Sequence, residues 1–482
     1  MSEYKSLTAL QIAEQVASGK LSAVEIAREA IRLAGSEGKE LNSFITICEE
    51  KAIAQAKRVD ESAGRAGRAD NDSRLRLAGV PIAIKDNISY TDYPCTCASH
   101  ILDRYIPPYD ATVVSRLIEA GAVIVGKTNM DEFAMGSSNE NSYYGPVKNP
   151  VRADLAPGGS SGGSCASVAR KIVPMALGSE TGGSVRQPAS LCGVFGLKPS
   201  YGAVSRYGLV AFASSTDQIG PIARNTKDLA LLYSVIAGRD RHDSTSVSFD
   251  HPDYARHLNT EKKFRIGIPR EYFGKGLHPE VARVVDAAKA ALTRAGHTFV
   301  DISLPRTDKG IAVYYVIACA EASANLARFD GVKYGLRASG EKSLFEMYRD
   351  TRSSGFGAEV KRRVMLGTYA LSAGYYDAYY IKAAKVRELL RRELEEAFNT
   401  VDLIICPTSP TPPFKLGEKI NDPLAMYLSD VYTVTANLTG VPAISIPYGT
   451  SSDGLPIGVQ FMAKYLDELA LFQISHTLEQ LR

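Results

Sequence analysis

Two glycine–serine segments hold the residues of this chain that are best suited to chemistry. Residues 157–164 read PGGSSGGS and residues 178–188 read GSETGGSVRQP, with central serines Ser160 and Ser184 that are 24 positions apart. Glycines let a backbone approach a substrate closely and turn its N–H groups inward. A serine hydroxyl can attack a carbonyl carbon or relay a proton. The two segments therefore indicate acyl transfer by serine.

A lysine upstream supplies a candidate base for such a serine. Lys85 directly follows the apolar run of residues 80–84, VPIAI. An exposed lysine is about 0.1% neutral or less at neutral pH, but burial at the end of an apolar strand lowers its pKa. One of Ser160 and Ser184 can attack while the other carries the proton to Lys85. Taken singly, Lys85 also fits an ordinary strand end, and either glycine–serine segment also fits a tight turn.

Three further matches are interpreted as accidental. Residues 121–128, GAVIVGKT, satisfy the phosphate-loop pattern, but the middle residues read as a strand rather than a loop. Residues 158–162, GGSSG, satisfy the serine-hydrolase pattern GxSxG, yet a proline-bracketed loop precedes them where that motif needs a strand. Residues 95–97, CTC, lack the second cysteine pair or histidines of a zinc site. We therefore expect no nucleotide site, no histidine-based triad and no metal.

The elements that must position the serines and the lysine alternate between strand and helix. Such alternation predicts an α/β fold. The apolar patterns predict strands at 80–84, 122–125, 173–177, 264–268, 403–406 and 443–446. They predict helices at 7–16, from Ser22 to 31, and at 49–62, 113–120, 164–170, 226–237, 279–295, about 310–330, about 375–398 and from 467 to the end. Residues 63–72 are small and polar and predict a surface loop.

Composition sets limits on the class of protein. The chain has 482 residues, 45% of them hydrophobic and 23% charged, with a net charge of +3, which argues against a strongly electrostatic nucleic-acid binder acting alone. The sequence has no uninterrupted run of eighteen apolar residues, so we expect no membrane span. No apolar signal core follows the first residues. The seven scattered cysteines fit reduced thiols in a cytoplasm. We expect one cytoplasmic domain over 1–482, with a helical region at 1–75, a catalytic half at 76–240 and a more helical half at 261–482.

The glycine–serine segments and the lysine segment together resemble the amidase signature family. The blocks are GGSSGGSCASVA, LGSETGGSVRQPASLCGVFGLKPSYG and VPIAIKDN. The resemblance implies an α/β fold in which helices cover both faces of a large mixed central β-sheet. It further implies a triad in which Ser184 is the acyl-forming nucleophile, Ser160 the bridging serine and Lys85 the base.

The resemblance also implies two features of the backbone. The peptide bond from Gly159 into Ser160 is expected to be cis. The backbone N–H groups of Thr181, Gly182, Gly183 and Ser184 are expected to form an oxyanion hole, which stabilises the charge that develops on the attacked carbonyl oxygen.

Over almost its whole length the chain resembles one branch of that family, whose members hydrolyse glutamine. The segments that carry this resemblance are residues 130–138, 314–318, 359–367, 373–380 and 427–433. Departures are mild: Glu180 stands where aspartate is common, and residues 434–436 read VTA where Ile-Pro-Ala is common. Neither departure removes a catalytic group.

This branch implies a site for the two charges of free glutamine. Arg363 is expected to bind the α-carboxylate, which arginine can hold through two hydrogen bonds, and Asp430 the α-ammonium. The expected pocket lining is Tyr314 or Tyr315 together with Met135, Gly136 and Ser137. Arg363 belongs to the charge run 361–363, and the motif register selects it over Arg362. Asp430 taken alone also fits a helix cap.

The branch also implies partners. The ammonia would pass to the B subunit of a heterotrimer, which uses ATP and Mg to convert misacylated Glu-tRNA(Gln) into Gln-tRNA(Gln), while a small C subunit braces the pair. This chain itself is expected to bind no cofactor and no membrane, and to meet the tRNA through its partner. Two alternatives stay open. One is a stand-alone amidase of the same family acting on another small amide. The other is a silent scaffold subunit, which need not keep the lysine and both serines.

Overall fold

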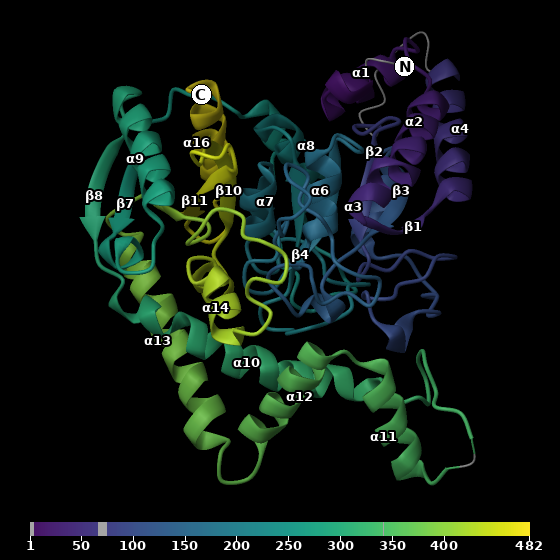
Figure 1. Ribbon diagram of the computed structural model, residues 1–482. Helices are drawn as coiled ribbons and strands as arrows, with labels where there is room; N and C mark the ends of the chain where they lie inside the picture. The colour runs from purple at the N-terminus through teal and green to yellow at the C-terminus, as the bar shows by residue number, and fades with distance from the viewer. Residues whose placement is uncertain (1–3, 66–74, 341) are drawn as a thin grey trace.

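One mixed sheet of eleven strands organises the protein (Figure 1). The computed structural model describes residues 4–65, 75–340 and 342–482. The strands are β1 (Phe44–Ile47), β2 (Pro81–Lys85), β3 (Val123–Thr128), β4 (Met175–Glu180), β5 (Phe195–Lys198), β6 (Gln218–Ala223), β7 (Arg265–Pro269), β8 (Thr298–Ile302), β9 (Leu403–Pro407), β10 (Ala443–Thr450) and β11 (Pro456–Ala463). Their order across the sheet is β1-β3-β2-β4-β6-β5-β10-β11-β9-β7-β8.

The helices flank this sheet and extend beyond it. They are α1 (Ala9–Ala17), α2 (Ala23–Gly35), α3 (Glu37–Leu41), α4 (Glu49–Arg65), α5 (Thr112–Glu119), α6 (Gly162–Ala169), α7 (Arg186–Cys192), α8 (Thr226–Ile236), α9 (Pro279–Arg294), α10 (Gly310–Asn325), α11 (Leu344–Gly355), α12 (Ala358–Leu371), α13 (Lys382–Ala397), α14 (Pro423–Tyr427), α15 (Val434–Thr439) and α16 (Glu468–Gln480). Helices α8, α16 and α9 pack in one layer, and α6 and α7 pack in another against the same strands. The α/β fold with a large mixed sheet is therefore confirmed.

Strand direction decides where the predicted catalytic residues meet. Strand β2 runs parallel to both β3 and β4, whereas β4–β6, β6–β5, β5–β10, β10–β11 and β11–β9 are antiparallel pairs. Every residue of β2, β3 and β4 is buried, as expected for parallel strands covered on both faces. In open sheets, ligands bind beyond the carboxyl ends of parallel strands. That edge carries Lys85, the residues after Thr128 and the residues after Glu180.

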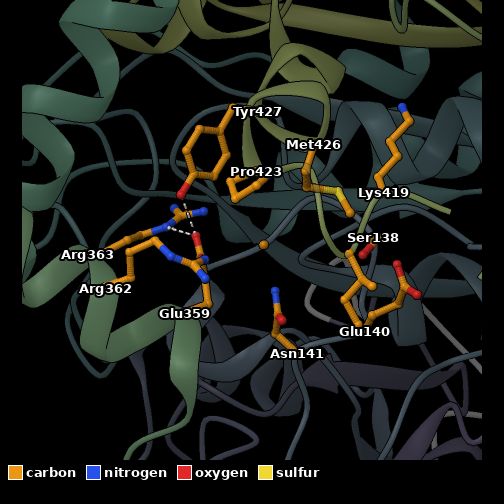
Figure 2. A pocket seen from close by; sticks show the side chains of 12 residues that line it. Ser138, Glu140, Asn141, Glu359, Arg362, Arg363, Lys419, Pro423, Met426 and Tyr427 are labelled. Carbon is orange, nitrogen blue, oxygen red and sulfur yellow. Dashed lines mark hydrogen bonds and ion pairs between the residues drawn. The ribbon is translucent and has the colours of Figure 1, made fainter. Parts of the chain in front are cut away.

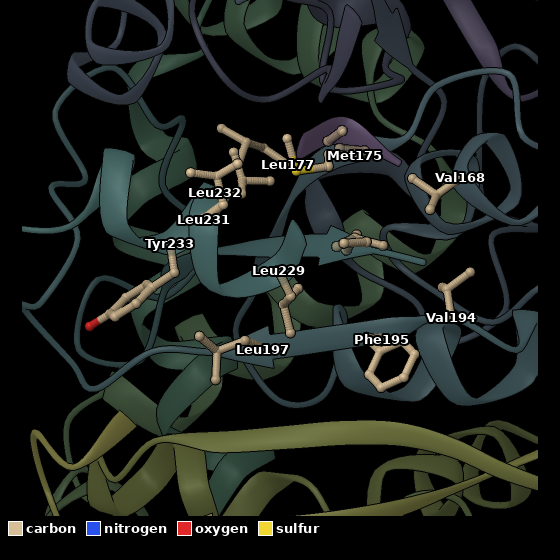
Figure 3. Close-up of a cluster of buried hydrophobic side chains, with 14 of the residues drawn as sticks. Val168, Met175, Leu177, Val194, Phe195, Leu197, Leu229, Leu231, Leu232 and Tyr233 are labelled. Atoms are coloured by element: carbon tan, nitrogen blue, oxygen red, sulfur yellow. The ribbon is translucent and has the colours of Figure 1, made fainter. Parts of the chain in front are cut away.

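The core around β4 and β5 holds this edge in place. Figure 3 shows apolar side chains from α6, β4, β5 with the residue before it, and α8 that fill the space between these elements: Val168, Met175, Leu177, Val194, Phe195, Leu197, Leu229, Leu231, Leu232 and Tyr233. Burying one such side chain stabilises the fold by about 1.5–3 kcal/mol. The backbone that leaves β4 therefore starts from a rigid base.

Local sequence signals account for many element boundaries. Thr8 caps α1 through a reciprocal pair of hydrogen bonds with Gln11, and Ser22 caps α2 by accepting from Glu25 N. All six predicted strands overlap observed ones, and each predicted helix overlaps a helix. Helix α4 runs to Arg65, past the predicted end at 62, so the prediction of a loop was wrong for residues 63–65. The rest of the predicted loop, residues 66–72, lies outside the described residues.

Five strands were not predicted, namely β1, β5, β6, β8 and β11. Strand β6 shows the reason. Its sequence QIGPIA contains a glycine and a proline, which normally interrupt a strand. The strand nevertheless pairs with β4 along its whole length and with β5 at its end. Its neighbours in the sheet, distant in sequence, decide its conformation.

The helices α10, α12 and α13 form a separate helical layer, drawn in green at the bottom of Figure 1. Helix α10 packs against both α12 and α13, through a cluster that includes Val313, Ile317, Val360 and Leu390. Residues 305–328, which include α10, are long and apolar enough by composition to cross a membrane. An 18-residue window of this segment has a mean hydropathy of 1.3, and 50% of that window is buried inside the protein. The prediction from uninterrupted apolar runs did not single out this segment. Its buried residues pack inside the protein.

Candidate active site

Lys85 lies at the carboxyl end of β2 and is fully buried. Its Nζ donates hydrogen bonds to Ser160 Oγ at 2.7 Å and to the carbonyl oxygen of Ser179 at 3.0 Å. Burial lowers the pKa of Lys85 from 10.5 to about 7, although the nearby charge of Asp131 opposes that change. A large fraction of this amine is therefore neutral near neutral pH, which is the state that a base requires.

The two glycine–serine segments lie side by side. The peptide bond between Gly159 and Ser160 is cis, as the family resemblance implies. The N–H of Ser161 donates to the carbonyl oxygen of Ser184 at 3.0 Å, and the N–H of Gly159 donates to Gln187 Oε1 at 3.1 Å. The structure thus brings Ser184 and its loop beside the hydroxyl that contacts Lys85. Ser160 is fully buried and Ser184 is 6% exposed.

The loop from Thr181 to Ser184 connects β4 to α7 and leaves backbone donors free. Among the described residues, the N–H groups of Gly182, Gly183 and Ser184 donate no hydrogen bond. The two glycines are required by close packing. A Cβ at Gly182 would lie 2.6 Å from Tyr314 Cζ, and a Cβ at Gly183 would lie 2.6 Å from Asp430 Oδ1. The side chains predicted to bind substrate therefore touch the loop predicted to form the oxyanion hole.

A buried ion pair holds the shape of this loop. Glu180 Oε2 accepts hydrogen bonds from the N–H groups of Val185 and Arg186, both at 3.0 Å. The Arg186 guanidinium pairs with Glu180, and its Nη2 also donates to the carbonyl oxygen of Thr433 at 2.9 Å. Burial raises the pKa of Glu180, but the Arg186 charge, the hydrogen bonds from Arg186 and the charge of Lys198 together hold it below the usual value. Glu180, which replaces the more common aspartate, thus closes the loop onto the start of α7.

Asp430 supplies a buried carboxylate beside that loop. It ends the short helix η9 (Leu428–Asp430) and is 5% exposed. Its Oδ2 accepts a hydrogen bond from Ser137 Oγ at 2.5 Å, while its Oδ1 has no partner among the described residues. Burial raises the pKa of Asp430 to about 7. An unpartnered buried carboxylate oxygen is suited to bind a cation.

Arg363 supplies a buried cation to the expected substrate site. It lies on α12 and is 2% exposed, whereas the side chain of Arg362 is 46% exposed. Its Nε donates to Glu359 Oε1 at 2.8 Å. Figure 2 shows the pocket beside it, with Glu359 between Arg363 and Tyr427. The pocket lining consists of Gly136, Ser138, Glu140, Asn141, Glu359, Arg362, Arg363, Lys419, Ile420, Pro423, Met426 and Tyr427.

The remaining predicted residues lie next to this pocket rather than in its lining. Tyr314, on α10, packs closely against Gly182, and its ring lies 5.0 Å from the ring of Tyr315. Tyr315 packs against the Arg363 guanidinium, with 5.0 Å between the Arg363 Cζ and the ring centre. Both tyrosines therefore contact the expected site, where the sequence left a choice between them. Met135 is fully buried in the apolar cluster that contains Tyr314.

Three supporting residues were not recognised from the sequence. Gln187 joins the two loops, because it accepts from Gly159 N and donates from Nε2 to the carbonyl oxygen of Ser137 at 2.8 Å. The Asp131 carboxylate accepts from the N–H groups of two residues further along its own loop, and burial raises its pKa to about 6. Thr433 Oγ1 donates to the carbonyl oxygen of Gly182 at 2.6 Å. All three residues lie inside the segments singled out in the sequence, 130–138, 178–188 and 427–433, which was the available signal.

The structure also explains the accidental motifs. The phosphate-loop pattern falls on β3, and Lys127 is fully buried there, with its Nζ 3.1 Å from Asp86 Oδ1. A lysine committed to that ion pair is not presented to a phosphate. Cys95 and Cys97 are both buried free thiols, and Cys95 Sγ donates to the carbonyl oxygen of Asp86.

Comparisons with known proteins agree on the family. The amidase family model matches residues 25–472. The chain is 55% identical over 459 residues to the A subunit of the glutamyl-tRNA(Gln) amidotransferase of Koribacter versatilis, covering 95% of each chain. It is 52% identical to the protein of the same name from Carboxydothermus hydrogenoformans, covering 98% of this chain and 97% of that one. The crystal structure of the corresponding A subunit from Thermotoga maritima superimposes with a TM-score of 0.81 at 40% identity, covering 99% of this chain and 95% of that one.

Proposed function

Because this chain belongs to the amidase family, we propose that it is the glutamine-hydrolysing subunit of a tRNA-dependent amidotransferase. One observation carries the proposal. Buried Asp430 lies against Gly183 of the loop that contains Ser184, and buried Arg363 packs on Tyr315, whose neighbour Tyr314 packs on Gly182 of the same loop. Free glutamine carries one carboxylate and one ammonium, and a buried cation and a buried anion complement that pair of charges.

The reaction begins with attack by Ser184 Oγ on the side-chain amide carbon of glutamine. The Ser184 proton passes to Ser160 Oγ, and the Ser160 proton passes to the neutral Lys85 Nζ, so that no charged serine accumulates. The tetrahedral oxyanion then collapses, the carbon–nitrogen bond breaks, and Lys85 returns the proton through Ser160 to the departing nitrogen. Ammonia leaves and a glutamyl ester remains on Ser184. Water attacks the ester by the same proton route in reverse and releases glutamate.

The loop beside Ser184 stabilises the oxyanion. The free N–H groups of Gly182, Gly183 and Ser184 supply donors. Thr181 is the first residue of the loop, and its hydroxyl donates to Asp217 Oδ1 at 2.7 Å, which orients the start of the turn. Removing one donor of this kind typically costs about 10²–10³ in rate.

In this proposal, recognition of glutamine uses Arg363 in the pocket lining and Asp430 next to the pocket. Arg363 binds the α-carboxylate and Asp430, held by Ser137, binds the α-ammonium. Tyr315 packs against Arg363, and Tyr314 packs against Gly182. The side-chain amide then extends toward the loop that contains Ser184, where Gly182 and Gly183 approach Tyr314 and Asp430.

The relatives named as the A subunit of this amidotransferase support a division of labour. In this proposal the ammonia passes to the B subunit, which uses ATP and Mg to amidate misacylated Glu-tRNA(Gln), and the C subunit completes a cytoplasmic heterotrimer. This chain contacts the tRNA through its partner and binds no cofactor itself.

The test is ammonia release from glutamine by the purified chain, alone and with the B and C subunits, ATP and glutamylated tRNA. We expect activity that rises with the partners and disappears in Ser184→Ala. Ser167→Ala is the matched control, because Ser167 is also buried, lies on α6 three residues after the first glycine–serine segment, and among the described residues its hydroxyl donates to the carbonyl oxygen of Ser164. Wild-type activity in Ser184→Ala would refute the mechanism. Turnover of other small amides, but not of glutamine, independent of partners, would instead indicate a stand-alone amidase.

A further inference from the structure

Glu359 connects the two sides of the expected glutamine pocket (Figure 2). It lies on α12, one helical turn before Arg363. Its Oε1 accepts a hydrogen bond from Arg363 Nε at 2.8 Å and another from the Tyr427 hydroxyl at 3.0 Å. Tyr427 ends α14, three residues before Asp430. One carboxylate oxygen therefore joins the helix that carries the cation to the segment that carries the anion.

Stacked rings hold the same contact from the side. The Tyr427 ring lies 3.9 Å from the Tyr315 ring at an interplanar angle of 26°. The Arg363 Cζ lies 5.0 Å from the centre of the Tyr315 ring and 5.4 Å from that of Tyr427. Aromatic rings attract a guanidinium and limit its rotation. The position of Arg363 thus depends on Tyr427 both through the ring and through the hydroxyl.

These contacts leave one edge of the guanidinium available. Glu359 occupies Nε, while Nη1 and Nη2 of Arg363 donate no hydrogen bond among the described residues. A carboxylate can be bound by two parallel N–H groups. With Nε taken, the edge formed by Nη1 and Nη2 is the one that can bind a substrate carboxylate.

Glu359 does not fully neutralise the charge of Arg363, because the same carboxylate also pairs with a second arginine. The Arg362 Nη1 donates to Glu359 Oε2. Two guanidinium groups face one carboxylate, so the cluster keeps one net positive charge. That charge lies beside the pocket, where a substrate carboxylate would need it.

We propose, on the premise of the proposed function, that the Glu359–Tyr427 hydrogen bond is a brace that sets the spacing between Arg363 and Asp430. The brace makes the site selective for amides that carry both an α-carboxylate and an α-ammonium. Glu359 and Tyr427 are positioning residues, since they act through Arg363 and Asp430 and not on the reacting carbon.

The test compares glutamine with γ-aminobutyramide, which is glutamine without its α-carboxylate. Glutamine hydrolysis by the assembled enzyme gives kcat and KM, and γ-aminobutyramide is measured as a competing ligand. Tyr427→Phe keeps the ring stack and removes the hydroxyl. We expect KM for glutamine to rise about tenfold, as for loss of a hydrogen bond to a charged group. We expect kcat and the inhibition constant of γ-aminobutyramide to be unchanged.

Two further variants separate positioning from folding. Glu359→Ala should raise KM for glutamine at least as much as Tyr427→Phe, whereas Glu359→Gln keeps an acceptor oxygen and should restore most of the affinity. Tyr465→Phe is the control, because the exposed hydroxyl of Tyr465 donates to the carbonyl oxygen of Tyr201, outside the pocket.

The outcomes separate the brace from the proposed function. An unchanged KM in Tyr427→Phe, or an equal loss of affinity for glutamine and for γ-aminobutyramide, overturns the brace and leaves the glutaminase proposal standing. A wild-type enzyme that hydrolyses no glutamine in a Ser184-dependent manner overturns the proposed function itself.

Discussion

Replacing Lys85 with methionine should separate catalysis from stability. Methionine has a similar length but cannot accept a proton. If Lys85 is the base, Lys85→Met should lower kcat/KM for glutamine by about 10²–10⁴, which is the usual contribution of a general base. KM should change little, because Lys85 contacts Ser160 and Ser179 and not the residues expected to bind glutamine.

Stability should move in the opposite direction. The pKa of Lys85 falls from 10.5 to about 7 on burial, so at pH 7 the folded state bears a cost on the order of 4 kcal/mol relative to an exposed lysine. The unfolded chain binds the extra proton between these two pKa values, and wild-type stability therefore rises as pH increases from about 7 toward 10.5. Lys85→Met removes this cost along with two hydrogen bonds that contribute about 1 kcal/mol each. We expect the variant to be as stable as wild type at pH 7, or more so, and to gain less on raising the pH.

Ammonia release and thermal unfolding at pH 7 and pH 9 measure the two quantities. Lys198→Met is the matched control, because Lys198 is also buried with a pKa lowered to about 7, but its Nζ donates to the carbonyl oxygen of Pro199. It should share the stability change and lose far less activity. The reasoning is refuted if Lys85→Met keeps kcat/KM within about tenfold of wild type, or if it loses activity only in proportion to unfolding.

The other predictions concern the same site. In a pH–rate profile, kcat/KM should fall below pH 7 more steeply than a single protonation allows. Burial brings the pKa of both Lys85 and Asp430 to about 7, so protonation removes the basic form of Lys85 and the charge of Asp430 in the same range. A slope of one proton contradicts this. Asp430→Asn should raise KM for glutamine yet increase thermal stability at pH 8, since the raised pKa means that the buried carboxylate destabilises the fold once ionised; a less stable variant contradicts this. Gly183→Ala should abolish activity, because the added methyl collides with Thr433 and Asp430, while Gly35→Ala, whose methyl would meet one side-chain carbon at 3.9 Å, should behave like wild type in the ammonia assay.

Local sequence patterns were sufficient where an element is decided by its own residues. The apolar run 80–84 predicted β2, and its last residue, Lys85, is buried as expected. Ser22 predicted the start of α2 and caps it. By contrast, strand β6 was missed, since its pairing with β4 and β5 outweighs the weak local signal of a strand that contains a glycine and a proline.

The site divides in the same way. The sequence by itself determined the types and order of the chemical groups: a lysine at the end of a buried strand, and two serines among glycines that let the backbone approach closely. Only the tertiary structure decided which groups meet. It places Asp430 and Tyr314 against Gly183 and Gly182. Such contacts join segments more than 100 residues apart, so no local pattern encodes them. They arise only when the sheet and the helical layer pack together and bring these buried side chains into contact.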